Sequence, residues 1–119
     1  MSCPCDGKKG LELAVCLAPP PGDYEAVIDL GQGKHLVINT TGLYVRNVVS
    51  DDYLPFIRTT SIKVSEATLR RLGLSDDVVL CAAIKSLQEA AEHGSEAAAL
   101  VVHSCEGLLK QLLDKCNTI

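Results

Sequence analysis

Aromatic side chains are nearly absent from this chain. Its 119 residues include three tyrosines, one phenylalanine and no tryptophan. Proteins that bind single-stranded nucleic acid stack the bases on aromatic rings that alternate with basic residues. With so few rings the chain cannot readily form such a surface, and its hydrophobic core must be built from aliphatic side chains.

Positive charge is scarce as well. Eleven lysine and arginine residues are outnumbered by fifteen aspartate and glutamate residues, and each half of the chain has two more acidic than basic side chains. Affinity for nucleic acid depends on neutralising phosphates, and basic segments are what bind anionic membrane surfaces. We therefore expect neither nucleic acid nor a membrane to be the partner.

Long apolar runs are missing too. No run approaches the ~20 residues that a membrane-spanning helix requires. The opening residues, MSCPCDGKKG, carry charges and glycines before Leu11 and so lack the apolar stretch of an export signal. On this basis we expect a cytoplasmic protein, in which the six cysteines are reduced thiols.

Sequence motifs of catalysis and cofactor binding are not found. The chain has no Gly-x-Ser-x-Gly and no His-Glu-x-x-His sequence. The glycines of Gly31-Gln32-Gly33 lack the third glycine of a dinucleotide-binding loop, because position 36 is a leucine. These absences favour a non-enzymatic protein without a cofactor.

The first half of the chain has the alternating pattern of β-strands. Four segments place apolar side chains at every second position: 11–17, 24–30, 35–38 and 43–49. Residues 56–64 can supply a fifth strand. Proline, glycine and asparagine lie in the short segments between them, as in turns. We expect a four- to five-stranded antiparallel β-meander over residues 11–64, because its connections are too short for crossovers.

From residue 65 onward the apolar residues recur at helical spacing. Ser65, Ser75 and Ser95 can each cap the start of a helix, and Gly73 and Gly94 can end one. The last helix has an apolar stripe with spacings of three and four residues: Ala97, Val101, Cys105, Leu108, Leu112 and Cys116. Three helices are therefore expected, and the last two should form an antiparallel hairpin.

Residues 78–84, VVLCAAI, fit either a helix or a buried strand. The helical pattern continues to Glu92, which favours a helix. The complete prediction is a single α+β domain over residues 11–119, with the meander in 11–64 followed by the three helices in 65–119.

The C-terminal helix leads to the main functional prediction. Four leucines form two adjacent apolar rows on its last turns: Leu108, Leu109, Leu112 and Leu113. One row can pack on the sheet while the other faces a partner, because a small core cannot cover unlimited apolar surface. We expect a small interaction or regulatory module that binds itself, as a homodimer or larger oligomer, or binds another protein.

Cys3-Pro-Cys5 leads to the alternative prediction, a protein that handles soft metals or thiols. Two thiolates one residue apart can chelate Zn²⁺ or Cu⁺. A tetrahedral zinc site needs two further ligands, such as Cys16 and a histidine. The competing interpretation is that residues 1–10 are a flexible tail without function, since chain ends often fray.

Cys81 is a candidate for a reactive thiol. At helical spacing it aligns with Asp77, Lys85 and Gln88 rather than with the apolar face, and the positive charge of Lys85 would stabilise a thiolate. Cysteine is also among the most buried residue types. The sequence favours a packed Cys81 side chain over a catalytic nucleophile.

Overall fold

The computed structural model describes residues 3–50 and 57–117. Along the chain the elements are α1 (Gly10–Leu17), β1 (Ala26–Gly31), β2 (Lys34–Asn39), β3 (Gly42–Ser50), β4 (Ile57–Lys63), α2 (Glu66–Arg71), α3 (Asp76–Glu92), α4 (Glu96–Ser104) and α5 (Glu106–Cys116). The four strands form one antiparallel sheet in the order β1-β2-β3-β4. The predicted α+β fold, an antiparallel meander followed by helices, is confirmed. Among the described residues no helix has both the length and the apolarity needed to cross a bilayer.

The first predicted strand is wrong, because residues 11–17 belong to helix α1. Its buried residues are Leu11, Leu13, Ala14 and Leu17, and the last three share one side of a helix. α1 packs against α3. A run of seven residues is too short for alternation to exclude a helix, and packing on α3 decides between the two. The expected fifth strand is present as β4, although residue 56 lies outside the described residues.

Tight hairpin turns join β1 to β2 and β2 to β3. Gln32 and Gly33 join β1 to β2 with positive φ angles of 56° and 76°, as a two-residue hairpin turn requires. At the next turn the buried Asn39 side chain donates a hydrogen bond to Glu25 Oε2 at 2.7 Å and accepts one from the Thr41 backbone N–H at 2.8 Å. These side-chain bonds hold the β2–β3 turn in place.

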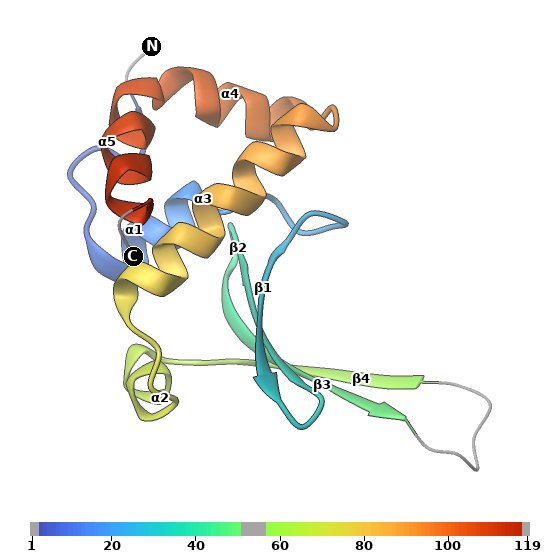
Figure 1. Ribbon diagram of the computed structural model, residues 1–119. Coiled ribbons are helices and arrows are strands. Elements are labelled where there is room, and N and C mark those ends of the chain that lie inside the picture. The colour runs from blue at the N-terminus through green and yellow to red at the C-terminus, as the bar shows by residue number, and fades with distance from the viewer. Residues whose placement is uncertain (1–2, 51–56, 118–119) are drawn as a thin grey trace.

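α3 is the element around which the others pack. Six of its residues are buried: Val79, Leu80, Ala83, Ile84, Leu87 and Ala90. It contacts α1, β1, β2, α4 and α5, and Figure 1 shows it between the sheet and the C-terminal helices. Residues 78–84 are therefore helical, as predicted. Ser65, Ser75 and Ser95 cap α2, α3 and α4 through their side-chain oxygens.

The last predicted helix is broken in two. α4 ends and α5 begins at Cys105, whose backbone (φ −106°, ψ 20°) interrupts the helix. The break turns α5 back toward the start of α3, where Lys115 Nζ lies 3.0 Å from Asp77 Oδ1. The predicted hairpin thus has a second arm in two segments. The apolar spacing continues across the break and so gave no sign of it.

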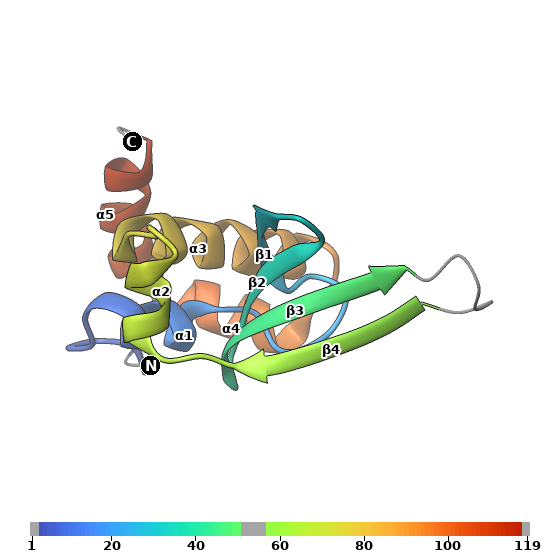
Figure 2. The same cartoon turned by 90° about the horizontal axis from the view of Figure 1, so that it is seen from below.

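The β3–β4 ribbon extends beyond the helices. The helices contact mainly β1 and β2, and Figure 2 shows β3 and β4 running out past them. Ile62 on β4 is 61% exposed. The long dimension of the molecule, 52 Å against 32 and 23 Å in the other two directions, fits this extension.

Removing a side chain from the centre of α3 should be costly. Ile84 is fully buried, so Ile84→Ala should lower the free energy of unfolding by about 2–5 kcal/mol. Val78→Ala on the same helix is the matched control, since Val78 is 39% exposed, and should change stability by less than about 0.5 kcal/mol. Urea denaturation of the oxidised proteins measures both. Equal losses would contradict the assigned core.

Candidate functional site

All six cysteines lie in the described residues, and all are paired. The bridges are Cys3–Cys105, Cys5–Cys16 and Cys81–Cys116, and no cysteine is free. Their Cα–Cα distances of 4.7, 5.8 and 5.7 Å lie in the range for disulfides. The expectation of reduced thiols is therefore corrected. The fold brings together cysteines that are 102, 11 and 35 residues apart in the sequence.

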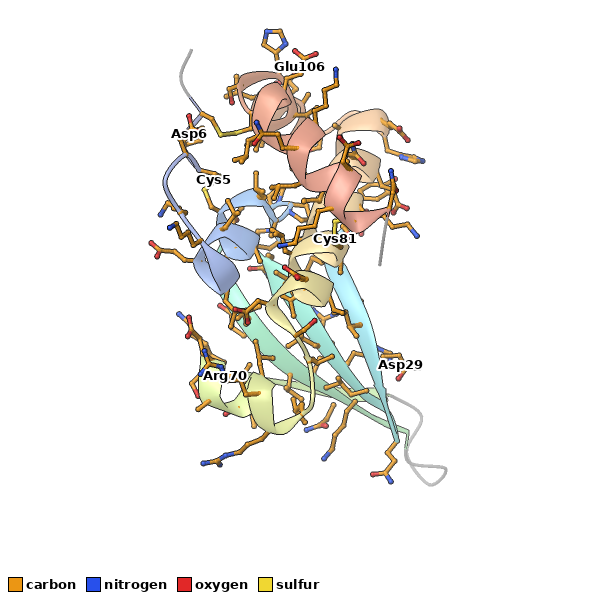
Figure 3. All side chains as sticks on the ribbon, turned by 60° about the vertical axis from the view of Figure 1, so that its left-hand side comes forward. Cys5, Asp6, Asp29, Arg70, Cys81 and Glu106 are labelled. Carbon is orange, nitrogen blue, oxygen red and sulfur yellow. A yellow bond between two sulfur atoms is a disulfide. The ribbon has the colours of Figure 1, made fainter. Side chains whose placement is uncertain are left out.

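Two of these bridges are in contact and form a cluster of four cysteines. The sulfurs of Cys3, Cys5 and Cys105 all lie within 4.8 Å of one another. Cys16 is bonded to Cys5 and brings the fourth sulfur to the group. We call Cys3, Cys5, Cys16 and Cys105 the sulfur cluster. Figure 3 shows Cys5 on the N-terminal segment beside α1, and Cys81 apart from it on α3.

Each bridge of the sulfur cluster joins a buried cysteine to a half-buried one. Cys5 and Cys105 have 0% and 1% of their surface exposed, whereas Cys3 and Cys16 are of intermediate exposure. Reagents in solution therefore reach the cluster through Cys3 or Cys16, and Cys5 and Cys105 are shielded.

The N-terminal segment is cross-linked to the rest of the fold. The sequence suggests a flexible tail over residues 1–10, of which residues 1 and 2 lie outside the described part. In the structure Asp6 N–H donates to the Cys3 carbonyl at 3.3 Å, and Lys8 N–H donates to the Cys5 carbonyl at 3.2 Å. These two hydrogen bonds form turns within the segment, and the Cys5–Cys16 and Cys3–Cys105 bridges attach it to α1 and to the α4–α5 corner.

A groove runs beside the sulfur cluster. Its volume is about 620 Å³, and it lies between α1, the β2–β3 turn and the start of α2. Cys16 is part of its wall, while Cys3, Cys5 and Cys105 are not. Its apolar lining is Leu11, Val15, Leu43 and Val64, and its charged lining is Lys8, Glu12, Lys63 and Glu66. One disulfide of the cluster is therefore open to a bound molecule.

The sulfur cluster has two chemical states that exclude each other. As disulfides the sulfurs carry no negative charge for a cation. Reduced and deprotonated, four thiolates can surround Zn²⁺, whose bonds of about 2.3 Å in a tetrahedron place sulfurs ~3.8 Å apart. In the bridged state the Cys3 and Cys105 sulfurs are bonded to each other, and the Cys5 sulfur lies within 4.8 Å of both, so opening the bridges would need small movements to reach that spacing.

The predicted metal ligands lie together, with one difference. Cys3, Cys5 and Cys16 are all in the sulfur cluster. The fourth sulfur belongs to Cys105, where the sequence suggested a histidine. Cys105 was missed because its place on the apolar stripe already accounts for a cysteine there, and no spacing links it to Cys3.

The other predicted residues lie away from the sulfur cluster. Cys81 is bonded to Cys116, so it is not a thiol in this structure. Leu109 is 3% exposed and belongs to the core, and Leu108, Leu112 and Leu113 are half-buried against it. A charge at Leu109 would therefore disrupt the monomer itself.

The three bridges should contribute unequally to stability. Cross-linking lowers the entropy of the unfolded chain more for longer loops, which gives about 5 kcal/mol for Cys3–Cys105, about 4 for Cys81–Cys116 and about 3 for Cys5–Cys16. Replacing each pair by serines should lower the urea midpoint of oxidised protein in that order. After reduction, the urea midpoints of the same variants should differ much less from one another. If replacing Cys3 and Cys105 lowered the urea midpoint least of the three, the assigned pairing would be contradicted.

The site is thus defined by its own geometry: four sulfurs from three segments, a groove on one side and a separate third bridge. No protein-family model, no curated protein and no solved structure matches this chain.

Proposed function

We propose that this protein binds a soft metal ion, Zn²⁺ or Cu⁺, through the reduced thiolates of the sulfur cluster. The supporting observation is that the sulfurs of Cys3, Cys5 and Cys105, from both ends of the chain, lie within 4.8 Å of one another. Cys16 completes a set of four. Four cysteine thiolates are a ligand set that tetrahedral Zn²⁺ takes in structural sites.

Burial favours a cation in the reduced cluster. Cys5 and Cys105 are buried, and an unpaired thiolate in such a place is strongly disfavoured. A bound Zn²⁺ or Cu⁺ would neutralise charge there and would replace the covalent links between the N-terminal segment, α1 and the α4–α5 corner. The same three segments would stay connected in either state.

The redox state of the surroundings would decide which form is present. Disulfides persist in oxidising compartments and are rare in a reducing cytosol. The cytoplasmic location expected from the sequence stays a prediction, and the metal-bound form is the one that we expect there. The bridged form belongs to oxidising conditions.

Metal binding should depend on the sulfur cluster and not on the third bridge. Fully reduced protein should bind one Zn²⁺ per chain, and Co²⁺ in its place should show the absorption bands of tetrahedral thiolate coordination. Cys3→Ser with Cys5→Ser should abolish both. Cys81→Ser with Cys116→Ser, the matched control, should bind as the unchanged protein does. Binding should weaken as the pH falls, because the ligands must lose protons.

The metal content of the Cys3 and Cys5 variant decides this proposal. The metal content is measured on a sample of the variant whose circular dichroism spectrum matches that of the unchanged reduced protein. Stoichiometric Zn²⁺ in that variant would exclude these ligands, and an unchanged reduced protein that binds no metal would exclude the function.

Self-association through the C-terminal helices is a second proposal. Leu108, Leu112 and Leu113 are only half-buried by their own chain, and Leu100 on α4 is 53% exposed. A partner copy, or another protein, can cover this remaining apolar surface. Such a role would make the protein an interaction or regulatory module, and it is compatible with metal binding.

Leu100→Glu tests this second proposal better than a change at Leu109. The unchanged protein should form a homodimer or larger oligomer in native mass spectrometry. The substitution should raise the dissociation constant of the oligomer at least about tenfold, or ~1.4 kcal/mol, while the monomer fold is retained. Asp114→Lys on the exposed side of α5 is a control for change of charge alone. A monomer at all concentrations, or an oligomer that Leu100→Glu leaves unchanged, would contradict the proposal.

A further inference from the structure

The groove and the sulfur cluster are joined through Cys16. Of the four clustered cysteines, Cys16 alone lines the groove, and its bonded partner Cys5 is fully buried. A molecule held in the groove can therefore reach one sulfur of the Cys5–Cys16 bridge and not the other.

We infer that the sulfur cluster is reduced in a fixed order by a small cysteine-containing peptide thiol that binds in the groove. The peptide thiol attacks Cys16, and the electrons pass from Cys5 to the second bridge. This inference rests on the proposed function, because it describes how the bridged cluster becomes the metal-binding one.

The lining of the groove indicates the class of thiol. Its volume of about 620 Å³ suits a small molecule. The α1 side carries Lys8 and Glu12, whose charged groups lie 3.3 Å apart, and the β4–α2 side carries Lys63 and Glu66. One positive and one negative group on each side, together with the apolar lining, fit a ligand that has both an amino and a carboxylate group. A short peptide with one cysteine meets these conditions.

The first step opens the bridge at the groove. The peptide thiolate forms a bond to Cys16 Sγ, the Cys5–Cys16 bond breaks, and its electron pair leaves on Cys5 Sγ. Attack at the sulfur of Cys5 is blocked, since that residue has no exposed surface. The product is a mixed disulfide at Cys16 and a buried Cys5 thiolate.

The second step passes the reducing equivalents to the other bridge. The Cys5 sulfur lies within 4.8 Å of those of Cys3 and Cys105, so its thiolate can attack Cys105 and expel Cys3. Cys3 is half-buried, and a thiolate near water is better solvated than a buried one. The intermediate holds a Cys5–Cys105 bond and a free Cys3.

Further peptide thiols complete the reduction. One attacks the peptide sulfur of the mixed disulfide at Cys16, which releases the oxidised peptide and the Cys16 thiolate. The Cys16 thiolate then attacks Cys5, which expels Cys105 and re-forms the Cys5–Cys16 bridge at the groove, because Cys5 and Cys105 are shielded from an external thiol. Two more peptide thiols reduce that bridge, the first by forming a mixed disulfide at Cys16 and the second by resolving it. In total four peptide thiols become two peptide disulfides, and two protein disulfides become four thiols. Cys81–Cys116 takes no part.

Reduced glutathione, a cysteine tripeptide, is the probe. Oxidised protein is mixed with a limiting amount without metal, quenched by alkylation at set times and mapped by peptide mass spectrometry. Glutathione should appear on Cys16 before Cys3, a Cys5–Cys105 peptide pair should follow, and Cys81–Cys116 should be reduced independently of these steps. In the Cys5→Ser with Cys16→Ser variant, Cys3–Cys105 should be reduced at least about tenfold more slowly, because the attack from within is lost. The Cys81→Ser with Cys116→Ser control should keep the rate of the unchanged protein.

The groove itself is tested by filling it. Val15→Phe should slow glutathione attack at Cys16, and Val27→Phe on the exposed side of β1 is its control. First attack at Cys3, or a Cys3–Cys105 rate that the loss of Cys5 and Cys16 leaves unchanged, would overturn the inference. The order of attack in the unchanged protein tests the inference even if that variant does not fold. Zn²⁺ titration of fully reduced protein is a separate measurement, so failure of the ordered reduction and failure of metal binding are told apart.

Discussion

The packing of α1, the sheet and the C-terminal helices around α3 is the constraint on which the structure depends. A chain without tryptophan and with one phenylalanine has few large side chains to fill a core, so close approach of backbones must replace them. Ala83 and Ala90 on α3 are buried and allow this approach. Because α1 and α5 both pack on α3, the N-terminal segment and the α4–α5 corner are brought to one place, where the sulfur cluster forms.

Local features of the fold could be predicted from the sequence, and long-range ones could not. The serine caps and the turn at Gln32 depend on neighbouring residues, so their signals are readable. The α1 error came from a short segment whose conformation is decided by its contact with α3. The break at Cys105 leaves the apolar spacing intact. Likewise, Cys3 and Cys5 stand out as a close pair, whereas their partnership with Cys105 depends on a contact across 102 residues.

Redox chemistry and folding are linked at the sulfur cluster. Two disulfides or one tetrathiolate metal site would connect the same three segments, and the reduced state without metal would connect none of them. The same position of the fold would thus be cross-linked either by disulfides or by a metal ion. The third bridge, which joins α3 to α5, does not belong to the sulfur cluster. It keeps the C-terminal helix attached to α3 whenever conditions are oxidising.

The 102-residue separation of Cys3 and Cys105 has a consequence for the synthesis of the protein. Cys3 leaves the ribosome long before its partner does. Throughout that interval Cys3 has no native partner, while the Cys5–Cys16 pair is complete as soon as α1 has emerged. During that interval Cys3 can form non-native disulfides, including with Cys5 and Cys16, which lie close by in the chain. A metal ion held by those early cysteines would protect all three thiols until Cys105 arrives.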